Sequence, residues 1–304
     1  MKTRSILIAY LLLIATTLFW GGNFVVGRAV SAEIPPLALS WWRWTFALVI
    51  ILPFSAHLLW KKRHILGRDW LYLLLVSFLG VCNFNSFVYL GLQTSPATDA
   101  LLLLSACPVM ILLLSRFIFG VRISYLQIMG VALSLIGVMT IITEGSISHF
   151  SALLSGNQGR FWILAAVFSW ALYSVLLRKR SAELTGLEFF SITAILGLAL
   201  ITPFYLYEHF IQQRHIAFNT TSVSTLIYVS VFASVLAFLF WNQGVQVLGA
   251  NQTGYFIHLI PVWGILLASL FLNEKLYVFH WVGMILIFSG IAMATRLSHK
   301  RVHP

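Results

Sequence analysis

Hydrophobic positions along the chain fall into long runs separated by short polar stretches, a pattern that predicts membrane-spanning helices. Each run holds about 20 residues, the length that an α-helix needs to cross the hydrocarbon core of a bilayer. The ten predicted segments are Ile6–Arg28, Leu37–Leu59, Trp70–Gly91, Pro96–Arg116, Ile123–Thr143, Arg160–Arg178, Leu187–Glu208, Ser222–Val247, Ala250–Leu272 and Tyr277–Arg296. We therefore expect an all-α polytopic membrane protein with ten transmembrane helices.

Composition supports this class. The 304 residues are 60% hydrophobic and only 9% charged, whereas about a quarter of the residues in a soluble domain are charged. The ten segments take up most of the chain, so little remains for a domain outside the membrane.

The basic residues indicate an orientation. Lys and Arg number 19 against 8 Asp and Glu, a net charge of +11, which on a soluble chain would suggest a nucleic-acid partner. Here most of them fall at the ends of segments that share one side of the membrane. The positive-inside rule then predicts that both termini are cytoplasmic, and no nucleic acid is needed as a partner.

The chain repeats itself. A shift of 150 positions places Trp20 on Trp170, Arg28 on Arg178 and Pro53 on Pro203, and a shift of 153 places Gly91 on Gly244, Ala97 on Ala250, Pro108 on Pro261, Gly130 on Gly283 and Gly137 on Gly290. The predicted units are residues 5–144 and 160–297, each with five crossings. Because five is odd, the second unit enters the membrane from the opposite side, and the repeats are inverted. Many secondary transporters have this architecture.

Several motifs resemble those of a known family. They are the Trp20-Gly21-Gly22-Asn23 stretch, Arg43, the Ala97–Pro108 stretch and its echo Ala250–Pro261, followed by Asn273-Glu274-Lys275. In this order and at this offset they resemble the EamA family of the drug/metabolite transporter superfamily. The resemblance implies a carrier in a bacterial inner membrane, with a central cavity, that most often exports amino acids and related metabolites. The first half departs from the pattern, because Gly120-Val121-Arg122 stands where the second half has Asn273-Glu274-Lys275.

Polar side chains at helical spacing predict the lining of that cavity, since polar groups in hydrocarbon need a partner or water. The predicted substrate-binding residues come from four segments: Trp20, Asn23, Asn85, Tyr89, Trp170, Tyr173, Tyr255 and His258. The alternative for each is a hydrogen bond between helices, which stabilises a bundle by about 0.6 kcal/mol on average.

Three ionisable residues are candidates for coupling or gating. His258 lies deep in its segment, and protonation there would couple transport to a proton; the alternative is a neutral histidine bonded to a neighbouring helix. Arg43 is either an interfacial anchor or the interior partner of a carboxylate. Asp99 either complements the positive end of its helix or faces the outer mouth of the cavity.

No motif points to catalysis, so we expect no enzyme activity, cofactor or metal site. The chain has no Gly-x4-Gly-Lys-Ser/Thr phosphate loop and no His-Glu-x-x-His motif. The leading prediction is a secondary transporter of small metabolites, most often an amino-acid exporter, acting as a monomer or homodimer in the bilayer. The alternatives are a drug or lipophilic-cation efflux carrier, a metabolite uptake permease and a non-transporting receptor or scaffold.

Overall fold

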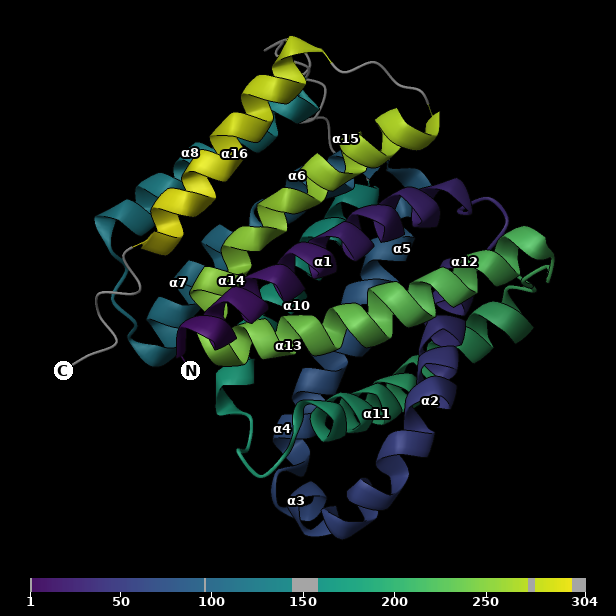
Figure 1. Cartoon of the computed structure of the whole chain (residues 1–304). Helices are drawn as coiled ribbons and strands as arrows, with labels where there is room; N and C mark the ends of the chain where they lie inside the picture. The colour runs from purple at the N-terminus through teal and green to yellow at the C-terminus, as the bar shows by residue number, and fades with distance from the viewer. Residues whose placement is uncertain (1, 96, 144–157, 273–276, 297–304) are drawn as a thin grey trace.

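The computed structural model describes residues 2–95, 97–143, 158–272 and 277–296, and the regular secondary structure in these ranges is entirely helical (Figure 1). The earlier elements are α1 (Lys2–Ala29), α2 (Pro36–Lys61), α3 (Arg63–Arg68), α4 (Trp70–Ser77), η1 (Phe78–Asn83), α5 (Phe84–Thr94), α6 (Ala97–Leu104), α7 (Cys107–Phe119) and α8 (Tyr125–Ile142). The later elements are α10 (Gln158–Leu176), η2 (Leu177–Lys179), α11 (Gly186–Leu206), η3 (Tyr207–Ile211), α12 (Thr220–Ser230), η4 (Val231–Leu236), α13 (Ala237–Leu248), α14 (Ala250–Tyr255), η5 (Phe256–His258), α15 (Leu259–Leu272) and α16 (Val278–Arg296).

Six helices in the described part of the chain are long and apolar enough to cross a membrane. They are Arg4–Ala29, Pro36–Lys61, Trp70–Thr94, Gln158–Lys179, Gly186–Ile211 and Thr220–Leu248. Shorter apolar helices cover Cys107–Phe119, Tyr125–Ile141 and Val278–Ala294. The chain is thus built as a polytopic membrane protein.

Two of the predicted segments are interrupted helices. The fourth breaks between α6 and α7, at Ser105 and Ala106, and the ninth passes through the 3₁₀ turn η5 between α14 and α15. A 3₁₀ turn has fewer residues per turn than an α-helix, so the side chains after it change direction. The two breaks are about 153 residues apart and face each other, because His258 Nε2 lies 2.8 Å from the Ser105 carbonyl oxygen.

The third and eighth predicted segments each contain a π-helical turn. These turns, η1 at Phe78–Asn83 and η4 at Val231–Leu236, are also 153 residues apart. π-turns are rare, and those inside α-helices occur frequently at functional sites. The same local irregularity therefore stands at equivalent places in the two halves of the sequence.

Helix ends follow recognisable local signals. Ser124 with Gln127, Thr185 with Glu188 and Asn219 with Ser222 form capping boxes at the starts of α8, α11 and α12. Gly120 ends α7 with φ +64°, a left-handed conformation that favours glycine. Glu188 therefore has the structural role of a helix cap.

A glycine-lined crossing joins α8 to α16, which lie side by side in Figure 1. A Cβ on Gly130 would lie 2.6 Å from the Gly290 carbonyl oxygen, and a Cβ on Gly137 would lie 2.6 Å from the Gly283 carbonyl oxygen. Small residues let two helices approach this closely in a membrane. The contacts run in opposite directions along the two helices, which makes the pair antiparallel.

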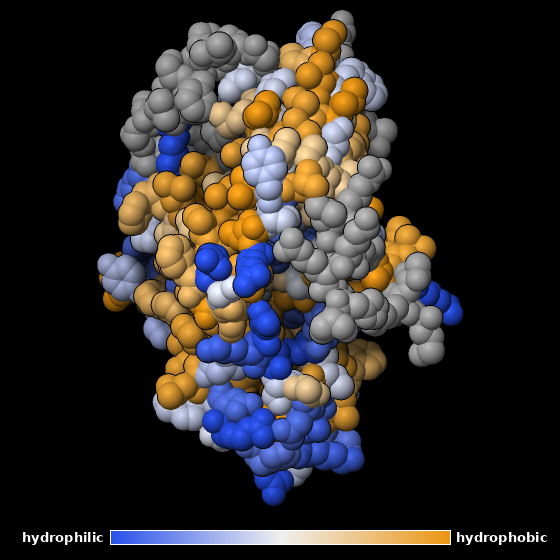
Figure 2. Space-filling view, turned by 90° about the vertical axis from the view of Figure 1, so that its left-hand side faces the viewer, coloured by the Kyte–Doolittle hydropathy of each residue, from blue (hydrophilic) through white to orange (hydrophobic). Residues whose placement is uncertain are grey.

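The outer surface carries many large apolar side chains on helices, as expected for contact with lipid rather than water. Phe117 is 82% exposed and Phe54 71% exposed. On the face shown in Figure 2, hydrophobic residues dominate the upper part and hydrophilic residues gather lower down.

Candidate functional site

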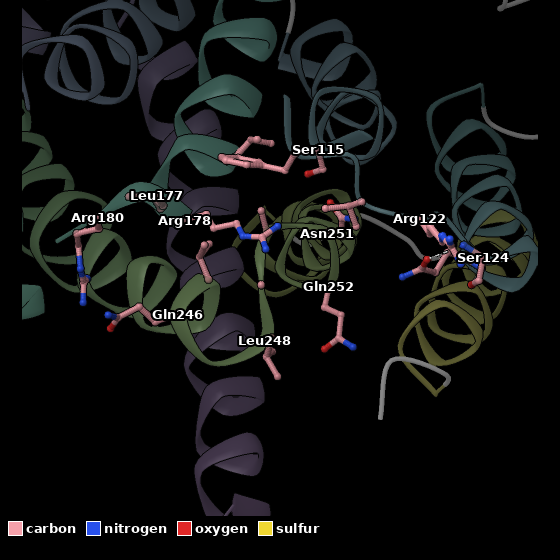
Figure 3. Close-up of a pocket in the computed structure, with 17 residues that line it drawn as sticks. Ser115, Arg122, Ser124, Leu177, Arg178, Arg180, Gln246, Leu248, Asn251 and Gln252 are labelled. Carbon is pink, nitrogen blue, oxygen red and sulfur yellow. Dashed lines mark hydrogen bonds between the residues drawn. The ribbon is translucent and has the colours of Figure 1, made fainter. Parts of the chain in front are cut away.

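A pocket of about 870 Å³ opens where several helix ends meet. Its walls come from the end of α7 and the start of α8, the end of α10, the end of α13 and the start of α14 (Figure 3). A volume of this size suits a small-molecule ligand. The pocket lies toward the end where α1 begins, because α13 runs antiparallel to α1: Trp20 Nε1 donates to the Ala233 carbonyl, while Leu13, nearer the start of α1, contacts Gly244.

The pocket lining is positively charged. Arg122, Arg178 and Arg180 lie among its residues, and none of the 17 residues that line it is acidic. Uncharged polar groups come from Gln246, Asn251, Gln252, Gln127, Ser115 and Ser124. Arg178 stacks over the ring of Phe119, with 5.1 Å from Cζ to the ring centroid.

Arg180 is half-buried, and its surroundings are unusual for a cation. Its Nε and Nη1 atoms are shielded from water without a hydrogen-bond partner in the described part of the protein. The guanidinium Cζ lies 5.6 Å from the centroid of the Phe189 ring. Burial lowers the pKa of Arg180, because desolvation penalises the charged form.

The opposite end of the molecule is held closed by bonds between helix ends. Arg28 Nη1 donates to the Leu92 carbonyl oxygen at 2.7 Å. Gln93 Nε2 donates to the Ser31 carbonyl oxygen at 3.0 Å, and Arg214 Nη2 donates to Gln93 Oε1 at 3.3 Å. The described structure is therefore open toward the start of α1 and closed at the other end.

Predicted cavity residues Trp20, Trp170 and Tyr173 lie together in a buried aromatic cluster. The Trp20 and Trp170 ring centroids are 4.9 Å apart and nearly perpendicular, and Trp241 lies 5.2 Å from Trp20. Tyr173 donates to Asn242 Oδ1 at 2.9 Å. None of the predicted cavity residues lines the pocket described above, and their role in binding substrate stays a prediction.

Arg43 is fully buried, so it is not the interfacial anchor that was one of its two predicted roles. Its Nε donates to Ser234 Oγ at 2.8 Å, and its Nη1 contacts Tyr89 at 2.5 Å and Asn23 at 3.3 Å. These partners are all neutral, and no carboxylate lies within ion-pair distance of Arg43 among the described residues. The predicted residues Asn23 and Tyr89 do meet, since Tyr89 also lies 2.8 Å from Asn23 Oδ1.

His258 is also fully buried and bridges two neighbouring elements. Since a carbonyl oxygen only accepts, Nε2 donates to Ser105, and Nδ1 lies 2.5 Å from Ser134 Oγ. This is the arrangement expected of a histidine bonded to neighbouring helices.

The remaining predicted residues are less engaged with one another. Asn85 is buried, with a long 3.5 Å contact to the Gly80 carbonyl, and Tyr255 is buried beside η5. The side chain of Asp99 lies outside the described residues. Among the described residues, no group of three or more His, Cys, Asp or Glu could hold a metal ion.

Sequence reasoning missed the pocket-lining residues Arg178, Arg180, Gln246 and Gln252. A signal for two of them was present, because Arg178 repeats Arg28 and Gln246 repeats Gln93 at the same offsets as the rest of the chain.

Comparison with known proteins identifies the class. The sequence model of the EamA-like transporter family matches residues 7–143 and 157–296. The chain belongs to this family and is an integral membrane protein of a transporter family.

Individual relatives are distant but cover most of the chain. The uncharacterized transporter YyaM of Bacillus subtilis is 25% identical, over 94% of this chain and 93% of its own length. A probable amino-acid metabolite efflux pump of Escherichia coli is 27% identical, over 90% of this chain and 89% of its own. One solved crystal structure shares the fold, with a TM-score of 0.75 at 17% identity over the whole of both chains.

Proposed function

We propose that this protein is a secondary transporter that exports small metabolites, amino acids among them, by alternating access. In this proposal residues 5–144 and 160–297 are two inverted five-helix repeats, giving ten transmembrane helices. The substrate passes between the repeats and meets Trp20, Asn23, Asn85, Tyr89, Trp170, Tyr173, Tyr255 and His258. Arg43, Asp99 and His258 act in coupling or gating, with a proton as the coupling ion, and both termini are cytoplasmic.

One observation carries the proposal. Arg28 and Arg178 stand at equivalent positions, 150 residues apart, but in different states. Arg28 bonds the Leu92 and Gln93 carbonyls at the closed end, whereas Arg178 makes no hydrogen bond within the described residues and faces the open pocket (Figure 3).

The counterparts of Leu92 and Gln93 complete this relationship. They are Val245 and Gln246, 153 residues later, and both line the same pocket as Arg178. In the opposite state, Arg178 would bond these carbonyls while Arg28 is released. Two states of this kind, related by exchange of the halves, are what alternating access requires.

The glycine crossing is consistent with the same symmetry. When each glycine is replaced by its counterpart in the other half, the contact of Gly130 with Gly290 becomes a contact of Gly283 with Gly137. That contact is the second one of the crossing, so the crossing is symmetric between the halves. Amino-acid metabolites come first as substrates because relatives from Escherichia coli and Salmonella typhimurium are named probable amino-acid metabolite efflux pumps.

The experiment is transport by the purified protein in liposomes. Preloaded labelled amino acids should leave by a saturable route that empty liposomes lack, and Trp20→Phe and His258→Asn should lower the flux while the protein remains folded. Absence of saturable flux for every member of an amino-acid and metabolite panel would refute the proposal.

A further inference from the structure

The charge of the open pocket has a feature that membrane topology does not explain. The positive-inside rule accounts for arginines on one side of a membrane, and an exposed arginine such as Arg63 satisfies it fully. It gives no reason for guanidinium groups to line a recess, nor for two nitrogens of Arg180 to be shielded from water without a partner. Buried donors without a partner lower stability, and a recess lined by three arginines and no acidic residue has an unbalanced positive charge that a bound anion would neutralise.

The protein's own acids nearby are already engaged. Glu183 accepts from Arg68 at 2.8 Å and lies 3.6 Å from His64. Glu188 accepts from the backbone nitrogen of Thr185 at 2.7 Å. Neither carboxylate lines the pocket, so its arginines are not neutralised by its own walls.

We propose that the pocket binds the anionic group of a small metabolite, a carboxylate or phosphate, through Arg180. Arg178, whose guanidinium lies over Phe119 while that of Arg180 lies over Phe189, adds positive charge to the same pocket. The planar guanidinium presents paired N–H donors whose geometry matches these groups. Arg122 adds positive charge from another wall, and Gln246, Asn251 and Gln252 supply donors and acceptors for the rest of the molecule. The inference rests on the proposed carrier function, and it narrows the substrates to solutes that carry an acidic group.

Matched pairs of solutes test this on the purified full chain in detergent. Succinate is compared with succinamide, and leucine with leucinamide, at equal ionic strength set with chloride. Each pair keeps the size of the solute and removes the carboxylate. The acids should raise the apparent Tm in a concentration-dependent way, since a ligand that binds only the folded state stabilises it, and the amides should not.

Variants connect the effect to the pocket. Arg180→Gln should weaken the apparent affinity for the acids by about tenfold or more, as expected for loss of a charge-assisted hydrogen bond. Arg178→Gln, which removes positive charge from the same pocket, provides a second variant if Arg180→Gln does not fold. Arg63→Gln is the matched control, because Arg63 lies outside the pocket and stacks on Trp60. Equal stabilisation by acids and amides, or unchanged affinity in both pocket variants, would overturn the inference.

Two further arms separate the sources of the anion and the two proposals. If Arg180→Gln abolishes stabilisation by phosphatidylglycerol nanodiscs but the soluble acids have no effect, the pocket holds a lipid headgroup and the inference is wrong. If liposomes transport acids and amides alike, with no effect of Arg180→Gln, the carrier function is supported and the anion site is refuted. If the acids bind through Arg180 but no solute is transported, the anion site is supported and the carrier function is refuted.

Discussion

Tyr173 donates a hydrogen bond to Asn242 at 2.9 Å, and the same pair of side chains recurs in the other half of the chain, where Tyr89 lies 2.8 Å from Asn23. Asn23 aligns with Tyr173 at the 150-residue offset, and Tyr89 aligns with Asn242 at the 153-residue offset. The bond is kept while the two residue types exchange places. The halves differ in the third residue of the group. Arg43 contacts Tyr89 in the first half, whereas the equivalent position of the second half is Thr193.

Replacing Arg43 by methionine should separate function from stability. A charge inside the membrane costs roughly 2.5–3.5 kcal/mol on the insertion scale, and Tyr89 donates directly to Asn23, a bond that can form without Arg43. We therefore expect Arg43→Met to keep or raise the apparent Tm and to lower liposome flux by about tenfold. The exposed Arg63→Met is the control; a variant that loses its folded state, or one with wild-type flux, would contradict a role in gating.

The glycine crossing between α8 and α16 should not tolerate a methyl group. Alanine is favoured over glycine in a helix, but at Gly137 its Cβ meets the Gly283 carbonyl and Ile287. Gly137→Ala should therefore destabilise the protein by about 1–3 kcal/mol, the usual range for overpacking, measured as a lower Tm. At Gly67 a Cβ meets nothing within 4 Å, so Gly67→Ala should leave the Tm unchanged or raise it. Equal behaviour of the two variants would show that the crossing is not tightly packed.

Glu208 caps a helix from a distant part of the chain. Its carboxylate accepts from the backbone nitrogens of Leu37 at 3.2 Å and Ala38 at 2.7 Å, at the start of α2. Pro35 and Pro36 cannot supply a side-chain cap there. Glu208→Ala should cost about 1–2 kcal/mol, as for loss of an N-cap, measured by thermal unfolding. The exposed Glu33→Ala should have no comparable effect, and an equal Tm for both variants would remove the capping role.

Acid should weaken a contact between the two halves of the chain. Arg68 donates to Glu183 at 2.8 Å and to Asp69 at 3.0 Å, and these bonds hold the pKa of both carboxyl groups below its usual range. Their contribution to stability is therefore complete above the ordinary carboxyl pKa of about 4 and is lost as the pH falls through the lowered values. The Tm difference between wild type and Arg68→Gln should be small near pH 7, because these groups are exposed, and should vanish toward pH 3. A difference that grows in acid would have the wrong sign.

The sequence predicted the class and the all-helical, membrane-spanning build, and it failed where the answer depends on tertiary packing. Apolar runs and the repeat offsets were enough for the segments, and Asn23 with Tyr89 could be grouped as neighbours. The breaks near Ser105 and His258 were not predicted, although Pro108 and Pro261 each follow a break by three residues and a proline disrupts the helical turn before it. That the two breaks contact each other depends on tertiary packing. The pocket was missed because its position depends on which end of the molecule is open, and this is a property of the conformation.

Labelling of one pair of equivalent residues tests alternating access most directly. Gln246 is exposed in the open pocket and Gln93 is half-buried at the closed end, and both native cysteines, Cys82 and Cys107, are buried. In purified protein, Gln246→Cys should react rapidly with a polar maleimide and Gln93→Cys slowly. Adding Arg28→Ala, which removes the bonds to the Leu92 and Gln93 carbonyls, should speed labelling at Gln93→Cys and slow it at Gln246→Cys. Rates at the two positions that rise together, or that ignore Arg28→Ala, would contradict an exchange between two states.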